Sequence, residues 1–191
     1  MRRIQFFIFI LGFSFFVSGC AVSLPFNNRV AYPTMQEAKS FSSINKGPIA
    51  LNWVPSDFPK RIDVQGASGY VGVASQTRIP TGVALANRIT ELLDLTVGVN
   101  ASASKVLTIK VIEAKSEFEY SAGIFNITPA IDVGRCIFAG EFILGNIRWS
   151  EKFTAERKDP AIGGTSQTGE LEKTWDDIAL QVARSVNQHM R

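Results

Sequence analysis

The sequence predicts an α+β domain in which an antiparallel sheet carries two helices on one of its faces. Two segments repeat apolar residues at helical spacing, and three long segments alternate between apolar and polar residues. These segments follow one another in the order β, α, β-β-β, α. We therefore expect a three-strand meander plus one or two N-terminal strands, with both helices covering the same face.

The N-terminal stretch has the pattern of a secretory signal. Arg2 and Arg3 precede an uncharged apolar run from Ile4 to Val17, and small residues follow it up to Cys20. The run is shorter than the roughly 20 residues that a membrane-spanning helix needs. A processed signal over 1–19 is therefore favoured over the alternative, an uncleaved signal anchor with an incidental cysteine.

Residues 20–47 are expected to form the mature N-terminus and an extended tether, followed by a single domain over 48–191. The tether shows no sustained periodicity and is interrupted by Pro25, Pro33 and the pair Gly47–Pro48. It would hold the domain away from the bilayer. Some of its apolar side chains are candidates for docking on the domain, namely Phe26, Tyr32, Met35 and Phe41.

The first elements of the domain are a strand and a helix. The strand is expected over 49–54, where Pro55 ends it. Glycines at 66, 69 and 72 indicate a relaxed strand or turn, because the stretch lacks the Gly-x-Gly pair and the Gly-Lys-Ser/Thr motif of phosphate loops. The helix is expected over 81–95, with Thr81 as its cap. Its apolar face consists of Leu85, Ile89, Leu92 and Leu93.

Three long strands are expected next, over about 106–120, 128–144 and 147–157. In the first, the alternating pattern changes phase near residue 111, so either its first half is buried on both faces or a bulge lies there. From Ile112 onwards we expect even-numbered residues on the core face. Gly145 and Asn146 predict a tight hairpin. The stretch 159–166 is expected to form a flexible loop.

The last element is a long amphipathic helix over 169–189. Its apolar residues lie on one stripe, consisting of Leu171, Trp175, Ile178, Ala179, Val182 and Val186. The opposite, outer face is expected to carry Glu172, Lys173, Asp176, Asp177, Gln181, Arg184 and Gln188.

Charge gives no argument for nucleic-acid binding. Two arginines leave with the signal, which lowers the formal net charge from +3 to about +1 if the Cys20 amine is acylated. The rest of the chain has no basic cluster beyond Lys60 and Arg61.

We expect no enzyme activity, no cofactor and no metal. Cys136 sits in an apolar alternating run and is expected to be a buried, inert thiol; the only histidine, His189, lies beside the C-terminus. One histidine and one free cysteine cannot make a usual zinc shell. Glu117 and Glu119 are expected on a solvated strand face, and the adjacent Asp176 and Asp177 point in different directions on a helix.

Aromatic side chains at strand and helix spacing are expected to form the core. A groove for lipid or glycan, or a patch for a partner, is the alternative. The residues concerned are Phe118, Tyr120, Phe125, Phe138, Phe142, Trp149, Phe153 and Trp175.

The four residues 17–20, Val-Ser-Gly-Cys, resemble the lipobox of bacterial lipoproteins. The resemblance implies that the signal peptide is cleaved before Cys20 and that Cys20 carries the lipid, including palmitate, that holds the protein on a membrane. Ala21 replaces the aspartate that would resemble an inner-membrane retention signal, which implies the cell outer membrane of a Gram-negative bacterium, facing the periplasm. The order of elements resembles small α/β outer-membrane lipoproteins of the YajG type, LptE and the auxiliary lipoproteins of lipid-transporting ABC systems.

The expected function is therefore that of a lipid-anchored, non-enzymatic envelope lipoprotein that binds a protein partner or an apolar ligand. One alternative is an auxiliary subunit of a lipid transport or outer-membrane assembly system. A hydrolase acting on cell wall or glycans, with Glu117 and Glu119 as its carboxylates, is the third possibility.

Overall fold

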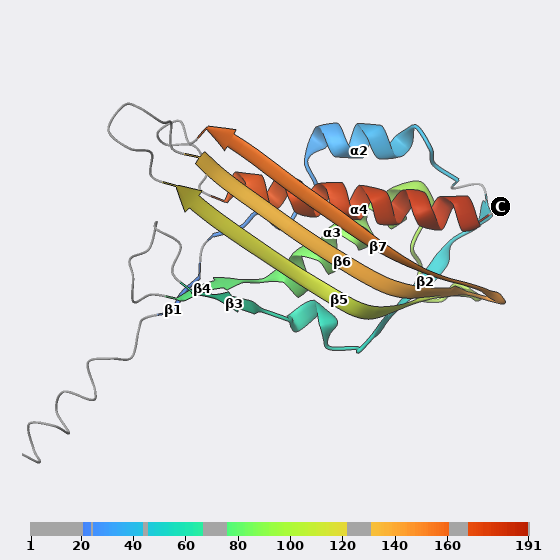
Figure 1. Ribbon diagram of the computed structural model, residues 1–191. Helices are drawn as coiled ribbons and strands as arrows, with labels where there is room; N and C mark the ends of the chain where they lie inside the picture. The colour runs from blue at the N-terminus through green and yellow to red at the C-terminus, as the bar shows by residue number, and fades with distance from the viewer. Residues whose placement is uncertain are drawn as a thin grey trace, which may run out of the picture.

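The computed structural model describes residues 21–23, 25–43, 46–66, 76–121, 131–160 and 168–190 (Figure 1). The signal stretch and Cys20 lie outside these ranges. The elements are β1 (Ala21–Ser23), α2 (Tyr32–Lys39), β2 (Ile49–Val54), the short 3-10 helix η3 (Phe58–Lys60), β3 (Asp63–Gln65), β4 (Gln76–Ile79), α3 (Thr81–Thr96), β5 (Lys105–Ser121), β6 (Ile131–Leu144), β7 (Ile147–Pro160) and α4 (Gly169–His189).

The main sheet has the strand order β2-β5-β6-β7. The antiparallel meander of β5, β6 and β7 is confirmed, with Gly145 in the hairpin at a φ of 60°. The sheet is not wholly antiparallel, because β2 pairs parallel with β5. The reason is that α3 connects these two strands as a crossover, which returns the chain in the same direction. The predicted α+β class is confirmed.

A second, three-stranded sheet has the order β1-β4-β3. β1 runs parallel to β4, and β3 runs antiparallel to it. The sequence predicted a relaxed strand or turn for the glycine-containing stretch. Residues 67–75 of that stretch lie outside the described residues. The strands β1, β4 and β3 lie at the end of the domain where β1 begins (Figure 1).

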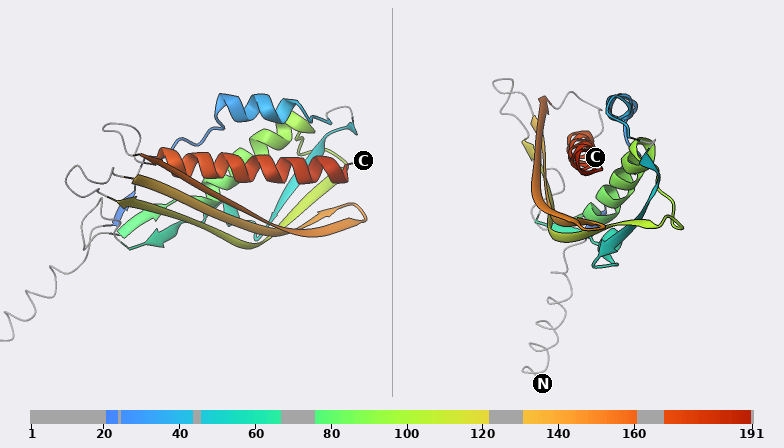
Figure 2. Two further views of the ribbon diagram at one scale, coloured as in Figure 1. Left: turned by 45° about the horizontal axis from the view of Figure 1, so that its top comes forward. Right: turned by 90° about the vertical axis from the view of Figure 1, so that its right-hand side faces the viewer.

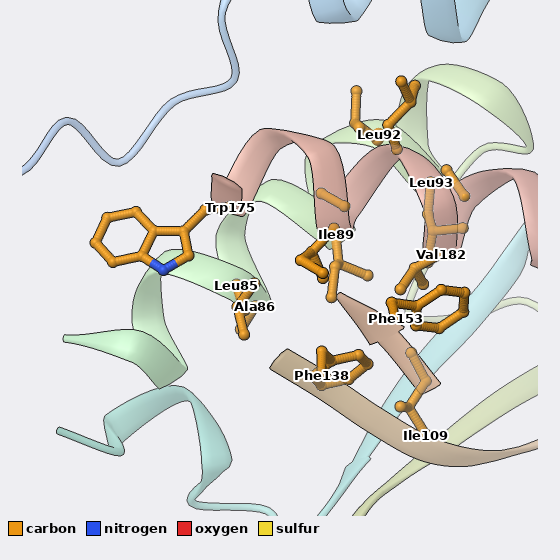
Figure 3. Packing of buried hydrophobic residues seen from close by; sticks show 14 of the residues in the cluster. Leu85, Ala86, Ile89, Leu92, Leu93, Ile109, Phe138, Phe153, Trp175 and Val182 are labelled. Carbon is orange, nitrogen blue, oxygen red and sulfur yellow. The ribbon is translucent and has the colours of Figure 1, made fainter. Parts of the chain in front are cut away.

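Both predicted helices are confirmed and lie on the same face of the curved main sheet (Figure 2). The α4 bounds agree with the prediction, and α3 ends one residue later. Thr81 does not cap α3, because its hydroxyl donates instead to Asp63 at 2.7 Å and Pro80 stands at the cap position. Figure 3 shows α3 side chains such as Leu85 and Ile89 packed in the same core as Phe138 and Phe153 of the sheet.

The change of phase in β5 is a β-bulge. The pairing of β5 with β6 shifts register between Val111 and Glu113. Leu107 and Ile109 face the core before the bulge, and Phe118 faces it afterwards. Ile112 was expected on the core face, but it stands at the irregular position and is 69% exposed. A bulge leaves its extra residue out of the alternation, which explains the error.

Strand β7 is longer than the sequence suggested. Asp159 and Pro160 were expected to begin a loop, but they pair with Asp132 and Ile131 of β6. A proline is tolerated here because β7 is an edge strand and Pro160 is its last residue, where a missing N–H group costs little. Residues 161–167 of the expected loop are outside the described ranges.

Candidate functional site

The N-terminal segment, defined here as residues 25–43, packs against the domain instead of extending from it. It contains α2, which contacts both α3 and α4. Val30 and Ala38 are buried, and Phe26, Met35 and Phe41 pack against the core. The extended tether expected over 20–47 is therefore wrong for this stretch. Three of its four candidate docking residues are confirmed, whereas Tyr32 is 69% exposed.

Carboxylates of α3 and α4 hold the backbone of the N-terminal segment. The amide of Asn27 donates to Glu172 at 2.7 Å, and the amide of Val30 donates to Glu91 at 3.1 Å. These contacts satisfy N–H groups that precede α2 and have no helical partner of their own. They also explain why a short helix that starts with few sequence signals is stable here.

A buried ion pair lies beneath this segment. Nε of Arg88 donates to Oδ1 of Asp176 at 2.8 Å, and both side chains are almost fully buried. Asp176 was expected on the outer face of α4. That prediction is wrong because the N-terminal segment covers this face: the amide of Ala31 donates to Asp176 at 2.9 Å, and Arg88 donates to the carbonyl of Asn27 at 2.6 Å.

The charge on Asp176 depends on its partners. Burial raises the pKa of Asp176, while the Ala31 amide and the Arg88 guanidinium act in the opposite direction. Arg88 also lies 5.2 Å from the ring centre of Trp175, so its cation contacts an aromatic face. The pair therefore joins α3, α4 and the N-terminal segment into one unit.

The edge of β5 is only partly covered by a neighbouring strand. β2 pairs with residues 105–110, and β5 continues for eleven more residues to Ser121. β3 lies beside this uncovered part, but it makes no backbone ladder with β5. The stretch of β5 from Ile112 to Phe118 is called the open edge below.

Two side chains of β3 satisfy the peptide groups of the open edge. The carboxamide of Gln65 accepts from the Phe118 amide at 3.0 Å and donates to the Phe118 carbonyl at 2.6 Å. The carboxylate of Asp63 accepts from the Ser116 amide at 3.1 Å. The Gln65 side chain thus occupies the place that a peptide group of a paired strand would take.

A groove of about 670 Å³ runs between β3 and the open edge. Exposed apolar side chains belong to its lining, with Ile62 54%, Val64 56% and Ile112 69% exposed. Charged side chains of both signs, including Arg61 and Lys115, complete it. Backbone hydrogen-bonding groups beside exposed apolar residues are the features that strand-binding edges present.

The carboxylates considered for catalysis are paired and exposed. Glu117 lies 2.5 Å from Lys115, and Glu119 lies 3.2 Å from Arg135, on the outer face of the sheet. Both glutamates are at least 46% exposed, as expected for a solvated strand face. Asp177 pairs with Arg157 through two hydrogen bonds of 2.7 Å. The structure does not bring these groups together in an enclosed site.

His189 packs within α4 and contacts the sheet. Its ring stacks on Trp149 with 4.0 Å between the ring centres, and its Nδ1 lies 2.8 Å from the Ser185 carbonyl. The Cys136 thiol on β6 contacts the Ser116 hydroxyl instead, at 3.7 Å. The described aromatic residues expected in the core are confirmed as buried or packed against it, namely Phe118, Phe138, Phe142, Trp149, Phe153 and Trp175. Phe125 lies outside the described residues.

Cys136 should be unreactive in the folded protein. Its side chain is 1% exposed, and burial raises the pKa of the thiol to about 12. The thiolate is the reactive form, so a neutral thiol-reactive dye at pH 8 should modify Cys136 only after unfolding in urea. The same reagent added to the urea-unfolded protein is the control. Rapid labelling of Cys136 itself in the folded protein, located by peptide mapping, would contradict the burial of this thiol.

Neither a membrane span nor a metal centre is found in the part of the chain that the structure describes. None of the helices there combines the length and the apolar composition needed to cross a bilayer. No group of three or more His, Cys, Asp or Glu side chains among the same residues is arranged to hold a metal ion.

The described fold has similarities to solved structures of bacterial proteins, including lipoproteins. A minor lipoprotein from Acinetobacter baumannii has a TM-score of 0.45 at 12% identity, over 75% of this chain and 92% of that one. A DUF330 protein from Xanthomonas campestris has a TM-score of 0.43 at 9% identity, over 89% and 94%. The rare lipoprotein B from Shewanella oneidensis has a TM-score of 0.38 at 17% identity, over 75% and 93%. At these values the similarity assigns neither a family nor a function.

No protein-family model matches the sequence, and no curated protein matches it.

Proposed function

We propose that the protein is a lipid-anchored, non-enzymatic envelope lipoprotein whose domain binds an extended segment of a protein partner along the open edge of β5. The lipobox-like residues 17–20 support the anchor, and Ala21 in the place of a retention-signal aspartate supports an outer-membrane location facing the periplasm. The observation that carries the binding function is the Gln65 carboxamide, which imitates a peptide group at Phe118.

A peptide partner suits this edge better than an apolar ligand. Backbone N–H and C=O groups of a strand give directional hydrogen bonds, and a partner strand can satisfy all of them when Asp63 and Gln65 turn away. An apolar ligand that displaced Asp63 and Gln65 would leave these backbone groups without partners, which is costly. The mixed charge of the groove lining, with Arg61, Glu113 and Lys115, also favours a polypeptide over a lipid tail.

A photo-crosslinking amino acid at Ile112 tests this proposal in intact cells. We expect it to crosslink an extended segment of one partner protein, because Ile112 borders the open edge. Gln65→Ala removes the competing carboxamide and should increase the crosslinking yield several-fold. The matched control for the probe is Ile147, an exposed isoleucine at the hairpin end of β7. The control for the substitution is Gln76→Ala, an exposed glutamine of β4.

Two results would contradict the proposal. Equal yields at Ile112 and Ile147 would show that the contacts are non-specific, and a lower yield with Gln65→Ala would show that the carboxamide does not compete with the partner. A mapped partner that belongs to a lipid transporter or an outer-membrane barrel assembly would assign this lipoprotein to such a system as an auxiliary subunit.

A further inference from the structure

The position beside β5 that a partner strand would take is closed at one end by β2. β2 pairs with β5 as far as Val54 and Lys110, and the chain then bends at Pro55. Beyond Lys110, no strand of the described chain pairs with this side of β5. A segment bound along the open edge therefore meets Val54 and Pro55 when it reaches Val111. It must either leave the sheet there or end there.

The hydrogen bonds of Gln65 indicate the direction of such a segment. Its carboxamide bonds both the N–H and the C=O group of one residue, Phe118, at 3.0 Å and 2.6 Å. Opposed residues of an antiparallel pair exchange both bonds in this way, whereas in a parallel pair the two groups bond different residues of the neighbour. An antiparallel segment that replaces Gln65 would run from Phe118 towards Val111, so its carboxyl-terminal end would lie at Val111.

A hollow of about 470 Å³ lies at that end of the open edge. Its lining includes Val111 of β5, Pro55 after β2 and the buried Phe58 of η3. Arg61 and Ile62 line both this hollow and the groove of about 670 Å³, so the two spaces adjoin. An apolar hollow beside a strand-binding edge can hold one side chain of the bound segment, and such pockets give specificity.

Two cations stand at this hollow. Lys60 and Arg61 both line it and are both exposed, against a single carboxylate in the lining, Asp57. Arg61 lies 3.3 Å from Asp63, and Lys60 forms no ion pair with any described residue. An internal peptide group brings no charge to this place, whereas the last residue of a chain brings an α-carboxylate. Ammonium and guanidinium groups donate charge-assisted hydrogen bonds to carboxylates, so the hollow favours a free carboxyl terminus.

We infer that the partner segment bound at the open edge is the C-terminal end of a polypeptide. Its last side chain is apolar and fills the hollow, and its α-carboxylate lies against Lys60 and Arg61. The residues before it pair antiparallel with the stretch from Ile112 to Phe118. At about 3.3 Å per residue this stretch is roughly 20 Å long, so it holds about six or seven residues. The inference rests on the proposed function and adds which part of the partner is bound.

Photo-crosslinking with mass-spectrometric mapping tests the inference on the natural partner. A photo-crosslinking amino acid at Ile62, which lines both spaces, should attach to the last few residues of the partner chain. The same amino acid at Val64 lies beside the part of β5 near Phe118 and should attach to residues that precede them. This order follows from the antiparallel direction.

A seven-residue peptide of alternating threonine and valine that ends in phenylalanine measures the role of the carboxylate. In fluorescence anisotropy, the full lipidated protein in detergent should bind it about five- to tenfold more tightly with a free carboxyl terminus than with a C-terminal amide. Lys60→Gln should remove most of this difference and leave the affinity for the amide unchanged. Lys105→Gln, which changes an exposed lysine at the start of β5, is the matched control. The difference should shrink at high salt, because exposed charges are screened.

The outcomes separate this inference from the proposed function. If the crosslinks map to an internal segment of the partner, or if the acid and the amide bind equally, the open edge binds strands but not chain ends. The inference is then wrong and the proposed function stands. Crosslinks in the reverse order at Ile62 and Val64 would show a parallel segment and also overturn it. If no protein is crosslinked at Ile62, Val64 or Ile112 and neither peptide binds, both proposals are wrong.

Discussion

Asp176→Ala is expected to lower the free energy of unfolding by about 3–5 kcal/mol, because it leaves the Arg88 cation buried without its partner. The loss should spread beyond the ion pair. The Ala31 amide and the Thr34 hydroxyl also donate to Asp176, so the N-terminal segment loses its central attachment. Urea unfolding measures the free energy, and limited proteolysis should show faster cleavage within residues 25–43.

The neighbouring residue provides a matched control for this prediction. Asp177→Ala removes an aspartate from the same turn of α4, but its partner Arg157 is 49% exposed. Exposed pairs contribute less than about 1 kcal/mol, because water solvates both charges once they separate. Similar losses for the two variants would show that the Arg88–Asp176 pair is not the attachment of the N-terminal segment.

Gly134→Ala is expected to destabilise the protein by about 1–3 kcal/mol, the typical cost of overpacking a well-packed core. A Cβ atom at this position of β6 would lie 2.5 Å from the Leu171 amide nitrogen and 2.6 Å from the Glu170 carbonyl carbon. These are backbone atoms of the first turn of α4, so relief requires the whole helix to move away from the sheet. Thermal unfolding monitored by circular dichroism measures the loss.

Gly66→Ala is the control for Gly134→Ala, since a Cβ atom added at Gly66 meets nothing within 4 Å. It should leave the stability nearly unchanged. If Gly134→Ala is tolerated as well as Gly66→Ala, the close approach of α4 to β6 cannot be a requirement of this fold.

Elements with a strong local period could be predicted from the sequence. The apolar stripe of α4 and the alternation of β5 and β7 each repeat over many residues, so tertiary contacts do not change the type of these elements. The phase change near residue 111 could likewise be predicted, because a bulge interrupts the alternation. α2 was missed because its eight residues begin at Tyr32 and Pro33 without a capping side chain.

The candidate site could be predicted less well than the fold. Asp176 and Asp177 look alike in the sequence, yet one is buried against Arg88 and the other is exposed beside Arg157. No local sequence pattern marks Gln65. Its role arises because β2 stops pairing with β5 after the first six residues of β5, which leaves the backbone of Phe118 open to the Gln65 side chain. A helical wheel of α4 assigns Asp176 to the polar side. Asp176 is buried because the N-terminal segment packs over that side of the helix.

The sequence by itself determined the lipobox-like residues before Ala21, the helices α3 and α4, the meander and the buried Cys136, since each depends on short-range pattern. Only the tertiary structure decided where the N-terminal segment lies, which aspartate is buried and which part of β5 stays uncovered. These features depend on residues far apart in the chain, such as Asn27 and Glu172, which are separated by 145 positions. Local periodicity carries no information about contacts at that distance, because packing alone selects them.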